Sequence, residues 1–297
     1  MNAVLDCQDV TNDLPLAVDI AIEKIRNLAT LPTVATQIIE MAACPDTGLN
    51  ELHAIINGDP ALGTRILKLA NSAFYGVPRQ IDSLDRAVVM LGMNAIKNTA
   101  IAASLHKVFR SSSTPSALNP RDLWLHSVAV AVAAKQLAIT TRTLKSDVAF
   151  LAGLIHDIGI MVEMQAYSIR FGEWAKSIAT PHENGFLAAE QEFWGATHQD
   201  FGAGLCRKWN FPFHLELATR YHHCPDLLPE DQRLLPTIIH VADIIAVRMD
   251  AGFTGTVDHA SVHPSALKML GLSDQDVDDL AATLPEELSQ AITLLGS

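Results

Sequence analysis

The chain has 297 residues, enough for one large domain or two small ones. Apolar residues make up 49% and charged residues 18%, so the chain can bury a sizeable core, which argues against wholesale disorder. The formal net charge is −12, and no stretch collects more than two close-set cations. Because an anionic surface repels phosphate backbones, we expect no nucleic-acid partner.

The cysteine pattern and the hydropathy predict the cellular location of the protein. The four cysteines are scattered without C-x-x-C spacing, which is typical of a reducing compartment. Residues 1–13 carry three aspartates and no cation, so they do not have the composition of a secretory signal. The most apolar run, Val128–Ala134, is far shorter than the ~20 residues of a membrane helix. We therefore expect a cytoplasmic protein without membrane contact.

Apolar residues recur at intervals of three and four along most of the chain, which is the spacing of amphipathic helices. Asp59-Pro60 and Asn119-Pro120 each combine an N-cap residue with a proline at the first helical position. No window in the first 110 residues alternates with the period of a strand. We therefore predict an all-α protein. The predicted helices cover 14–30, 33–43, 49–57, 61–72, 84–91, 93–109, 120–139, 145–164, 167–178, 184–194, 197–209, 212–222 and 232–250.

A change of composition divides these helices into two halves. Residues 111–120 are rich in Ser, Thr and Pro, as in a linker. Ser273 and Asp276 have the spacing of a capping box for a final acidic amphipathic helix. The predicted organisation is an N-terminal extension with the first helix at 1–24, a helical half at 25–110, a linker at 111–119, a second helical half at 120–251 and an acidic helical tail at 252–297.

From residue 120 onward, His and Asp recur at predicted helix faces and ends. His156 and Asp157 follow an apolar run in which nothing else is charged, and burying either group without a partner is costly. Imidazole and carboxylate both ligate Zn, Fe and Mn, so a divalent metal is a natural partner. Each residue alone also has a structural interpretation, as a helix-dipole or ion-pair partner. Taken together, the series favours a metal site made of Asp122, His126, His156, Asp157, His198, His222, His223 and Asp243.

Two runs in the first half are more specific. They are Ile55-Ile56-Asn57-Gly58-Asp59-Pro60-Ala61-Leu62 and Arg65-Ile66-Leu67-Lys68-Leu69-Ala70-Asn71-Ser72-Ala73-Phe74-Tyr75-Gly76. With shorter matches at 87–92, 123–127 and 209–212, they resemble the HDOD domain, a branch of the HD superfamily of metal-dependent phosphohydrolases. The resemblance covers roughly residues 25–250. It implies an N-terminal helical bundle packed on an HD-like helical bundle that holds the metal site.

The resemblance also implies a role in bacterial signal transduction, since HDOD domains generally lack demonstrated hydrolase activity. They are similar to the HD-GYP phosphodiesterases of cyclic di-GMP. In that family a carboxylate four residues before the first His, an HD pair, a further His, an HH pair and a late Asp hold the metals. Matched position by position, this implies the whole series above as ligands, with one or two ions of Fe, Mn or Zn as cofactor.

Two features of the HD-GYP site are missing. The lysine expected three residues after Asp157 is Ile160, and no Gly-Tyr-Pro follows His198. Hydrolysis of an anionic substrate needs cations to stabilise the charge that develops on phosphorus. Two metals could do much of this, but Ile160 supplies no charge, and no arginine lies close in sequence to a ligand except Arg121 and Arg220. We therefore favour a non-catalytic signalling module that binds a signalling protein or a small effector, such as a nucleotide. The alternative is an active metal-dependent phosphohydrolase of a nucleotide or cyclic dinucleotide, with Asp157 as its catalytic residue.

Overall fold

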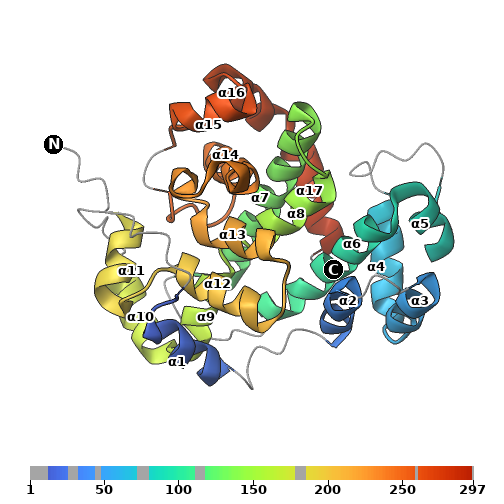
Figure 1. Cartoon of the computed structure of the whole chain (residues 1–297), viewed down its shortest axis with the longest axis horizontal. Coiled ribbons are helices and arrows are strands. Elements are labelled where there is room, and N and C mark those ends of the chain that lie inside the picture. Colours follow the sequence, from blue (N-terminus) through green and yellow to red (C-terminus); the bar gives the residue numbers. More distant parts are fainter. Residues whose placement is uncertain are drawn as a thin grey trace.

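The computed structural model describes residues 13–25, 33–43, 48–71, 80–110, 118–177, 185–257 and 260–295. These residues form α-helices and two short 3-10 helices joined by loops, with no strand among them (Figure 1). The all-α prediction is confirmed. Most of the predicted linker lies outside the described residues.

The first half is a small bundle around one long helix. Helix α6 packs against α2, α4 and α5. Asp59 caps α4 as predicted, by accepting from the Leu62 backbone N–H at 3.1 Å, and Ser83 caps α5 by accepting from the Arg86 N–H at 3.3 Å. Helix α1 lies elsewhere, against α9 and α12 of the second half. The helices are α1 (Leu16–Lys24), α2 (Thr33–Ala43), α3 (Leu49–Asn57), α4 (Pro60–Ala70), α5 (Leu84–Leu91) and α6 (Met93–Arg110).

Asn71, at the C-terminus of α4, fastens the chain that returns toward α5. Its side-chain amide donates to the carbonyl oxygens of Leu67 and Ile81 at 2.8 and 2.6 Å and accepts from the Ile81 N–H at 2.6 Å. The interruption of the apolar pattern at Asn71 is therefore structural, because all three bonds hold backbone groups that need partners when buried.

We expect Asn71→Ala to lower the free energy of unfolding by about 2 kcal/mol, because it leaves the Ile81 N–H and carbonyl without their partner. Asn94→Ala, at an exposed position of α6, is the matched control and should change stability by less than about 0.5 kcal/mol. Urea unfolding of both variants beside the wild type measures the difference, and equal midpoints for the two variants would contradict this role of Asn71.

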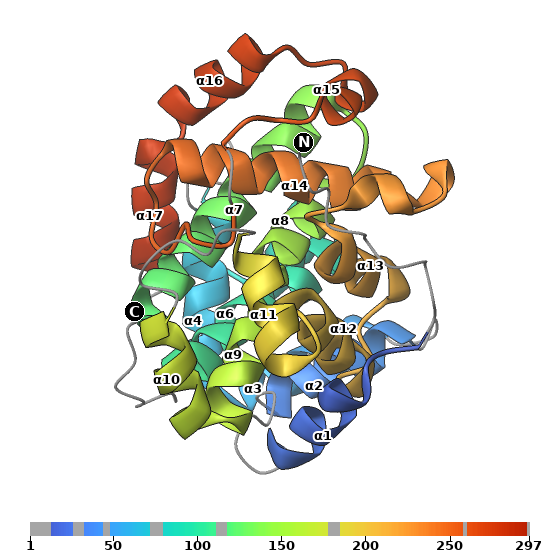
Figure 2. The same ribbon diagram turned by 90° about the vertical axis from the view of Figure 1, so that its left-hand side faces the viewer.

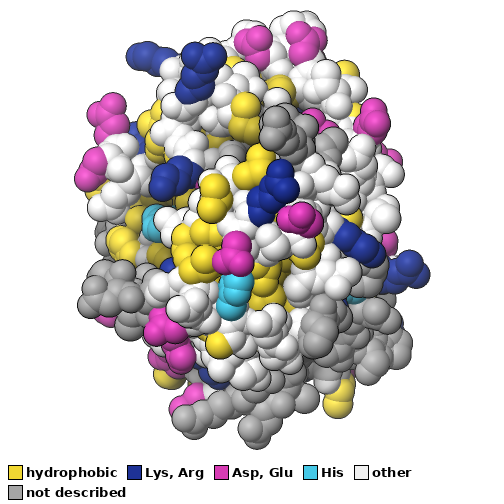
Figure 3. All heavy atoms as spheres, turned by 90° about the vertical axis from the view of Figure 1, so that its right-hand side faces the viewer, with side chains coloured by type: hydrophobic (Ala, Val, Ile, Leu, Met, Phe, Trp, Pro, Cys, Tyr) yellow, Lys and Arg dark blue, Asp and Glu magenta, His cyan; other side chains and the backbone are white. Residues whose placement is uncertain are grey.

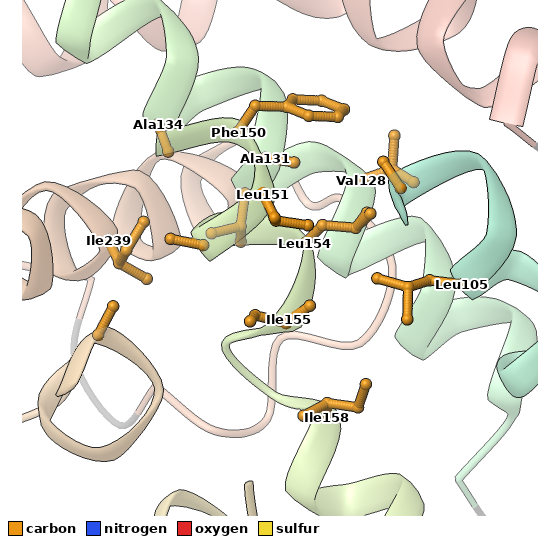
Figure 4. Close-up of a cluster of buried hydrophobic side chains, with 14 of the residues drawn as sticks. Leu105, Val128, Ala131, Ala134, Phe150, Leu151, Leu154, Ile155, Ile158 and Ile239 are labelled. Atoms are coloured by element: carbon orange, nitrogen blue, oxygen red, sulfur yellow. The ribbon is translucent and has the colours of Figure 1, made fainter. Parts of the chain in front are cut away.

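The second half is organised around α7, which packs against α8 and α14. By length and composition α7 could cross a membrane, but 78% of its apolar window is buried inside the protein, so it is the core helix. Figure 4 shows Val128, Ala131 and Ala134 of α7 meeting the apolar side chains of α8. The helices here are α7 (Pro120–Thr141), α8 (Ser146–Ile155), α9 (Ile158–Ala166), α10 (Ser168–Ser177), α11 (Phe186–Trp194), α12 (His198–Lys208), α13 (Phe213–Tyr221) and α14 (Leu234–Arg248), with 3-10 helices η2 (Pro225–Leu227) and η3 (Glu230–Gln232).

One predicted helix is divided. The spacing predicts a single helix over 145–164, but α8 ends at Ile155 and α9 begins at Ile158. Asp157 has φ −98° and ψ 15°, outside the helical region, so the chain turns there. Adjacent side chains of a continuous helix point ~100° apart, and this turn brings His156 and Asp157 to one side.

The C-terminal tail is more extensive than the one final helix predicted. It contains α15 (Pro264–Leu270), α16 (Asp274–Thr283) and α17 (Pro285–Leu295), because Pro285 begins a new helix directly after Leu284. The capping box of Ser273 and Asp276 is present at the start of α16. Helix α17 packs against α7 of the second half and α4 and α6 of the first, so the tail joins the two halves (Figure 2).

Candidate metal centre

Seven of the eight predicted ligands converge in the interior of the second half. His126 comes from α7, His156 and Asp157 from the α8–α9 turn, His198 from the start of α12, and Asp243 from the middle of α14. His222 and His223 follow the last turn of α13. Their donor atoms form three overlapping groups that could each hold an ion: Asp157, His198, His222 and His223; His126, His156 and Asp157; His156, His222 and Asp243.

Four of the imidazole rings are anchored in the same way. The Nδ1 atoms of His126, His156 and His222 lie 3.3, 2.7 and 2.8 Å from the backbone carbonyls of Ala251, Gly153 and Thr219. The Nδ1 atom of His198 lies 2.8 Å from a carboxylate oxygen of Glu190. Since a carbonyl or carboxylate oxygen can only accept, each Nδ1 carries the proton and donates it. The Nε2 atom of each ring is thereby directed into the centre, as in metal-ligating histidines.

The inward atoms have few partners of their own. The Nε2 atoms of His126 and His156 and one oxygen each of Asp157 and Asp243 are buried without a hydrogen bond in the described part of the chain. The Nε2 atom of His198 lies 3.5 Å from that of His222 and 3.2 Å from that of His223. Donors about 2.0–2.2 Å from a common ion stand roughly 3–3.5 Å apart. The spacing and the donor types therefore fit a divalent metal.

Asp157 is the hub of this cluster. Its carboxylate oxygens lie 3.2, 3.3 and 3.4 Å from the Nε2 atoms of His198, His156 and His222. Burial alone would raise the pKa of Asp157, but the adjacent rings of His156 and His198 hold it well below its usual value. Asp243 faces the other side, 3.0 Å from His126 Nε2, and its pKa is also lowered, burial being outweighed by His126. Both carboxylates are therefore ionised and ready to bind a cation.

The histidines divide into two kinds. Burial alone would lower the pKa of His156 and His198, but the carboxylates beside them have the larger effect. Asp157 raises the pKa of His156 above its usual value, and Glu190 together with Asp157 raises that of His198 well above it. Burial, only partly opposed, lowers the pKa of His222, and burial with the neighbouring rings lowers that of His223 well below its usual value. His156 and His198 therefore keep a second proton to higher pH than a free imidazole does, whereas His222 and His223 lose theirs at lower pH.

Asp122 is the predicted ligand that the structure does not bring to the cluster. Its side chain is exposed, and none of the donor groups in the described residues includes it. Its backbone carbonyl accepts from the N–H of Phe253 at 3.0 Å, which ties the start of α7 to the segment after α14. A position four residues before His126 on a helix shares its face, but it lies one turn nearer the helix end and here reaches solvent.

Three buried residues of the site were not predicted from sequence. Glu190 on α11 bonds His198, and the Thr256 hydroxyl donates to Asp157 at 3.5 Å. Glu163 on α9 is buried, and burial together with the charge of Glu190 raises its pKa well above its usual value. Glu163 and Glu190 both occupy apolar faces of their helices, which is the signal that could have identified them. Thr256 lies in a polar loop, where sequence gives no such signal.

The cluster is almost closed to solvent. His126, His156, Asp157, His198 and His222 are 0% exposed and Asp243 is 1% exposed, whereas His223 is partly exposed. Ile160, at the position where the HD-GYP family has lysine, is 0% exposed in the apolar core. Arg220, in the last turn of α13, pairs with Asp200 at 3.7 Å and donates to the Asp13 carbonyl. In the described part of the chain, neither Ile160 nor Arg220 therefore supplies the metal ligands with a free cation for a phosphate.

A model of the HDOD domain family matches residues 28–225 of the chain. Asp243 and Thr256 lie beyond this match. Among sequence relatives, a protein of Treponema pallidum (strain Nichols) is 26% identical over 281 residues, covering 92% of this chain and 52% of the relative. The chain thus spans about half the length of the curated relative that it matches.

Solved structures with the same fold include an HDOD domain protein of Geobacter sulfurreducens with unknown function. It is 26% identical, with a TM-score of 0.72, and the match covers 95% of this chain and 97% of that one. A Marinobacter aquaeolei VT8 protein, whose name proposes signal transduction, is 21% identical, with a TM-score of 0.71 and coverage of 94% and 65%. A Shewanella amazonensis SB2B protein, whose name proposes a metal-dependent phosphohydrolase, is 19% identical, with a TM-score of 0.63 and coverage of 94% and 96%. The last two likenesses concern the fold alone.

Proposed function

The chain belongs to the HDOD domain family, and from this premise we propose that it is a signal-transduction module that holds a metal centre without hydrolysing a substrate. The observation that carries the proposal is the common anchoring of four rings, which directs four Nε2 atoms toward Asp157 and Asp243 in a closed interior. Such outer hydrogen bonds fix the tautomer and orientation of metal-ligating histidines. In this role the metal stabilises the second half of the protein.

We propose a binuclear centre of Fe, Mn or Zn. Asp157 belongs to two of the three donor groups, with His198, His222 and His223 in one and His126 and His156 in the other. Histidine nitrogens lie near both carboxylate oxygens of Asp157, so Asp157 would help to hold both ions. Asp243 would complete the second position beside His126, at 3.0 Å from its Nε2 atom. Mixed imidazole and carboxylate donors suit these three metals.

Two surface features support the binding of a partner or effector. A groove of about 640 Å³ lies between α4 and α17, lined by Lys68, Gln80 and Gln290 and floored by apolar residues, and its volume is within the range of small-molecule sites. On the face of the first half, hydrophobic side chains gather among charged ones (Figure 3). In α5 of the first half, Val89 and Met90 are 83% and 38% exposed, and exposed apolar patches often bind proteins.

The alternative function, a metal-dependent phosphohydrolase, is favoured by the donor set itself. Metal ions in such a centre act as Lewis acids and lower the pKa of bound water. Asp157 is the residue that would then contact the reacting groups. The closed cluster and the apolar Ile160 argue against it. A cytoplasmic location and the absence of membrane or nucleic-acid partners stay predictions from the composition.

Metal analysis and activity assays on one preparation test the proposal. The full chain, purified without a histidine tag, is expected to contain about two equivalents of Fe, Mn or Zn by elemental analysis, and a His156→Ala/Asp157→Ala variant to contain almost none. His263→Ala is the matched control, because its ring is exposed and outside the cluster, and it should keep the full content. Metal-free wild type would overturn the metal centre.

The same preparations, loaded with each metal, are then incubated with cyclic dinucleotides and with a generic phosphodiester. We expect no turnover above the buffer rate. Turnover by the wild type that disappears in Asp157→Ala, with His263→Ala still active, would overturn the non-catalytic proposal and establish the hydrolase.

A further inference from the structure

A groove between the first half and the C-terminal tail is lined by residues that are far apart in the sequence. Helix α17 packs against α4, and the groove beside this contact has a volume of about 640 Å³, within the range of small-molecule sites. One wall comes from α4 and the segment before α5, and the other comes from α17. A molecule in this α4–α17 groove would therefore contact both parts of the chain.

Both walls of the α4–α17 groove are held in place without a ligand. Asn71 fixes the segment with Gln80 and Ile81 to the end of α4, through bonds of 2.6 Å to the Ile81 N–H and carbonyl. Helix α17 is fixed by its buried apolar side chains, which are Leu288, Ala291 and Leu295. A preorganised site loses less conformational freedom when a ligand binds, so this groove is suited to bind one.

The groove carries one charge and several neutral hydrogen-bonding groups. Lys68 is the only charged side chain among the described residues that line it. Besides Asn71, whose amide is used by the backbone, the neutral polar side chains are Thr64, Gln80, Ser289, Gln290 and Thr293. A carboxylate at Lys68 would form a charge-assisted hydrogen bond and could accept further bonds from hydroxyl and amide groups. The described lining therefore favours an anion.

The apolar part of the lining limits what this anion can be. Its side chains are Leu67, Ile81 and Leu294, and none of the described lining residues is aromatic. A phosphate monoester carries about −1.5 to −2 charges at pH 7, and bases bind well by stacking on aromatic rings. One lysine beside aliphatic side chains suits neither part of a nucleotide. It suits an acid with a single charge and an aliphatic body.

We propose that the α4–α17 groove binds a small aliphatic monocarboxylate, with its carboxylate at Lys68 and its body on the apolar floor. This proposal rests on the signalling function proposed above and names the chemical class of its effector. Because the ligand contacts α4 and α17 together, its binding stabilises the docking of the tail on the first half. None of the groove residues belongs to the donor groups of the metal centre.

Octanoate and its uncharged amide, octanamide, test the carboxylate. Titration calorimetry should show one octanoate per chain, and octanamide should bind about tenfold or more weakly, because a hydrogen bond to a charged group is lost. In Lys68→Gln the affinity for octanoate should fall by a similar factor, and the difference between acid and amide should vanish. Lys268→Gln is the matched control, an exposed lysine of α15 outside the groove, and should bind octanoate like the wild type.

A variant that fills the groove tests the position of the apolar body. Gln290 lines the groove from α17 and is partly buried, so the larger side chain of Gln290→Trp should abolish binding of both octanoate and octanamide. Hydrogen exchange should show that octanoate protects α17 in the wild type and not in this variant. Circular dichroism confirms that the variants are folded.

Four results would overturn the proposal. The first is an absence of saturable octanoate binding, and the second is equal affinity of the wild type for octanoate and octanamide. The third is octanoate binding that survives in both Lys68→Gln and Gln290→Trp, which would place the acid elsewhere. The fourth is displacement of octanoate by AMP, which would show that the groove takes a nucleotide.

Chelator-stripped wild type separates this proposal from the metal centre. It should bind octanoate with the affinity of the untreated protein, because the groove shares no residue with the donor groups. If the purified wild type contains no metal but binds octanoate at Lys68, the metal centre fails and the monocarboxylate site stands. If it contains metal but does not bind octanoate, the monocarboxylate site fails and the metal centre stands.

Discussion

Gly159→Ala is expected to destabilise the protein by about 3 kcal/mol or more, enough to lower the thermal midpoint by about 10 °C. A Cβ atom at this position would stand 1.8 Å from the His198 carbonyl oxygen and 2.7 Å from the Gly202 backbone nitrogen. Both contacts are with backbone, so the obstacle cannot rotate away, and α9 must separate from α12. That movement would also part the α8–α9 turn, which holds Asp157, from His198.

The matched control lies in another helix. Gly63 of α4 is helical, and a Cβ there would meet only the Ile56 side chain, at an ordinary 3.5 Å. Gly63→Ala should therefore stabilise the protein by about 0.5–1 kcal/mol, the intrinsic preference of a helix for alanine over glycine. Differential scanning fluorimetry of both variants, with and without added metal, measures these shifts. Equal midpoints for Gly159→Ala and the wild type would contradict the close crossing of α9 and α12.

The same crossing shows what sequence can and cannot predict here. Helical periodicity and the caps at Asp59 and Ser83 are local properties, so the all-α fold and most of the helix limits could be predicted. The His and Asp series could be predicted because polar groups in apolar helices need partners. The break at Asp157 and the contact between Gly159 and α12 depend on tertiary packing, which periodicity does not record.

The remaining differences between the predicted and the observed site concern residues around the ligand cluster. Asp122 has the right spacing from His126, but its side chain is exposed at the start of α7, and its backbone carbonyl bonds the segment after α14. Glu190 and Thr256 approach His198 and Asp157 from α11 and from a loop after α14. No fixed spacing connects such residues to the ligands, so only the folded chain can identify them.

Metal binding should release up to two protons, and the affinity should therefore fall by up to about 100-fold for each unit of decreasing pH. The pKa values of His156 and His198 are raised by the carboxylates beside them, so both rings keep a second proton to higher pH than a free imidazole does. Each must lose its Nε2 proton before it can ligate. His222 and His223, whose pKa values are lowered, are already neutral and release none.

The pH window follows from the sign of these shifts. Because the pKa values of His156 and His198 are raised in the folded protein, the dependence should be strongest at acidic pH and fade as the pH rises through those values. Calorimetric titration of chelator-stripped protein with Zn or Mn, in two buffers of different ionisation enthalpy, counts the protons. Proton release that declines between pH 6 and pH 9 would confirm that His156 and His198, beside Asp157, carry protons that the metal displaces. An affinity that does not change with pH would show that His156 and His198 are neutral before the metal binds. Their protonation in the metal-free protein would then be ruled out, but the donor geometry would be unaffected.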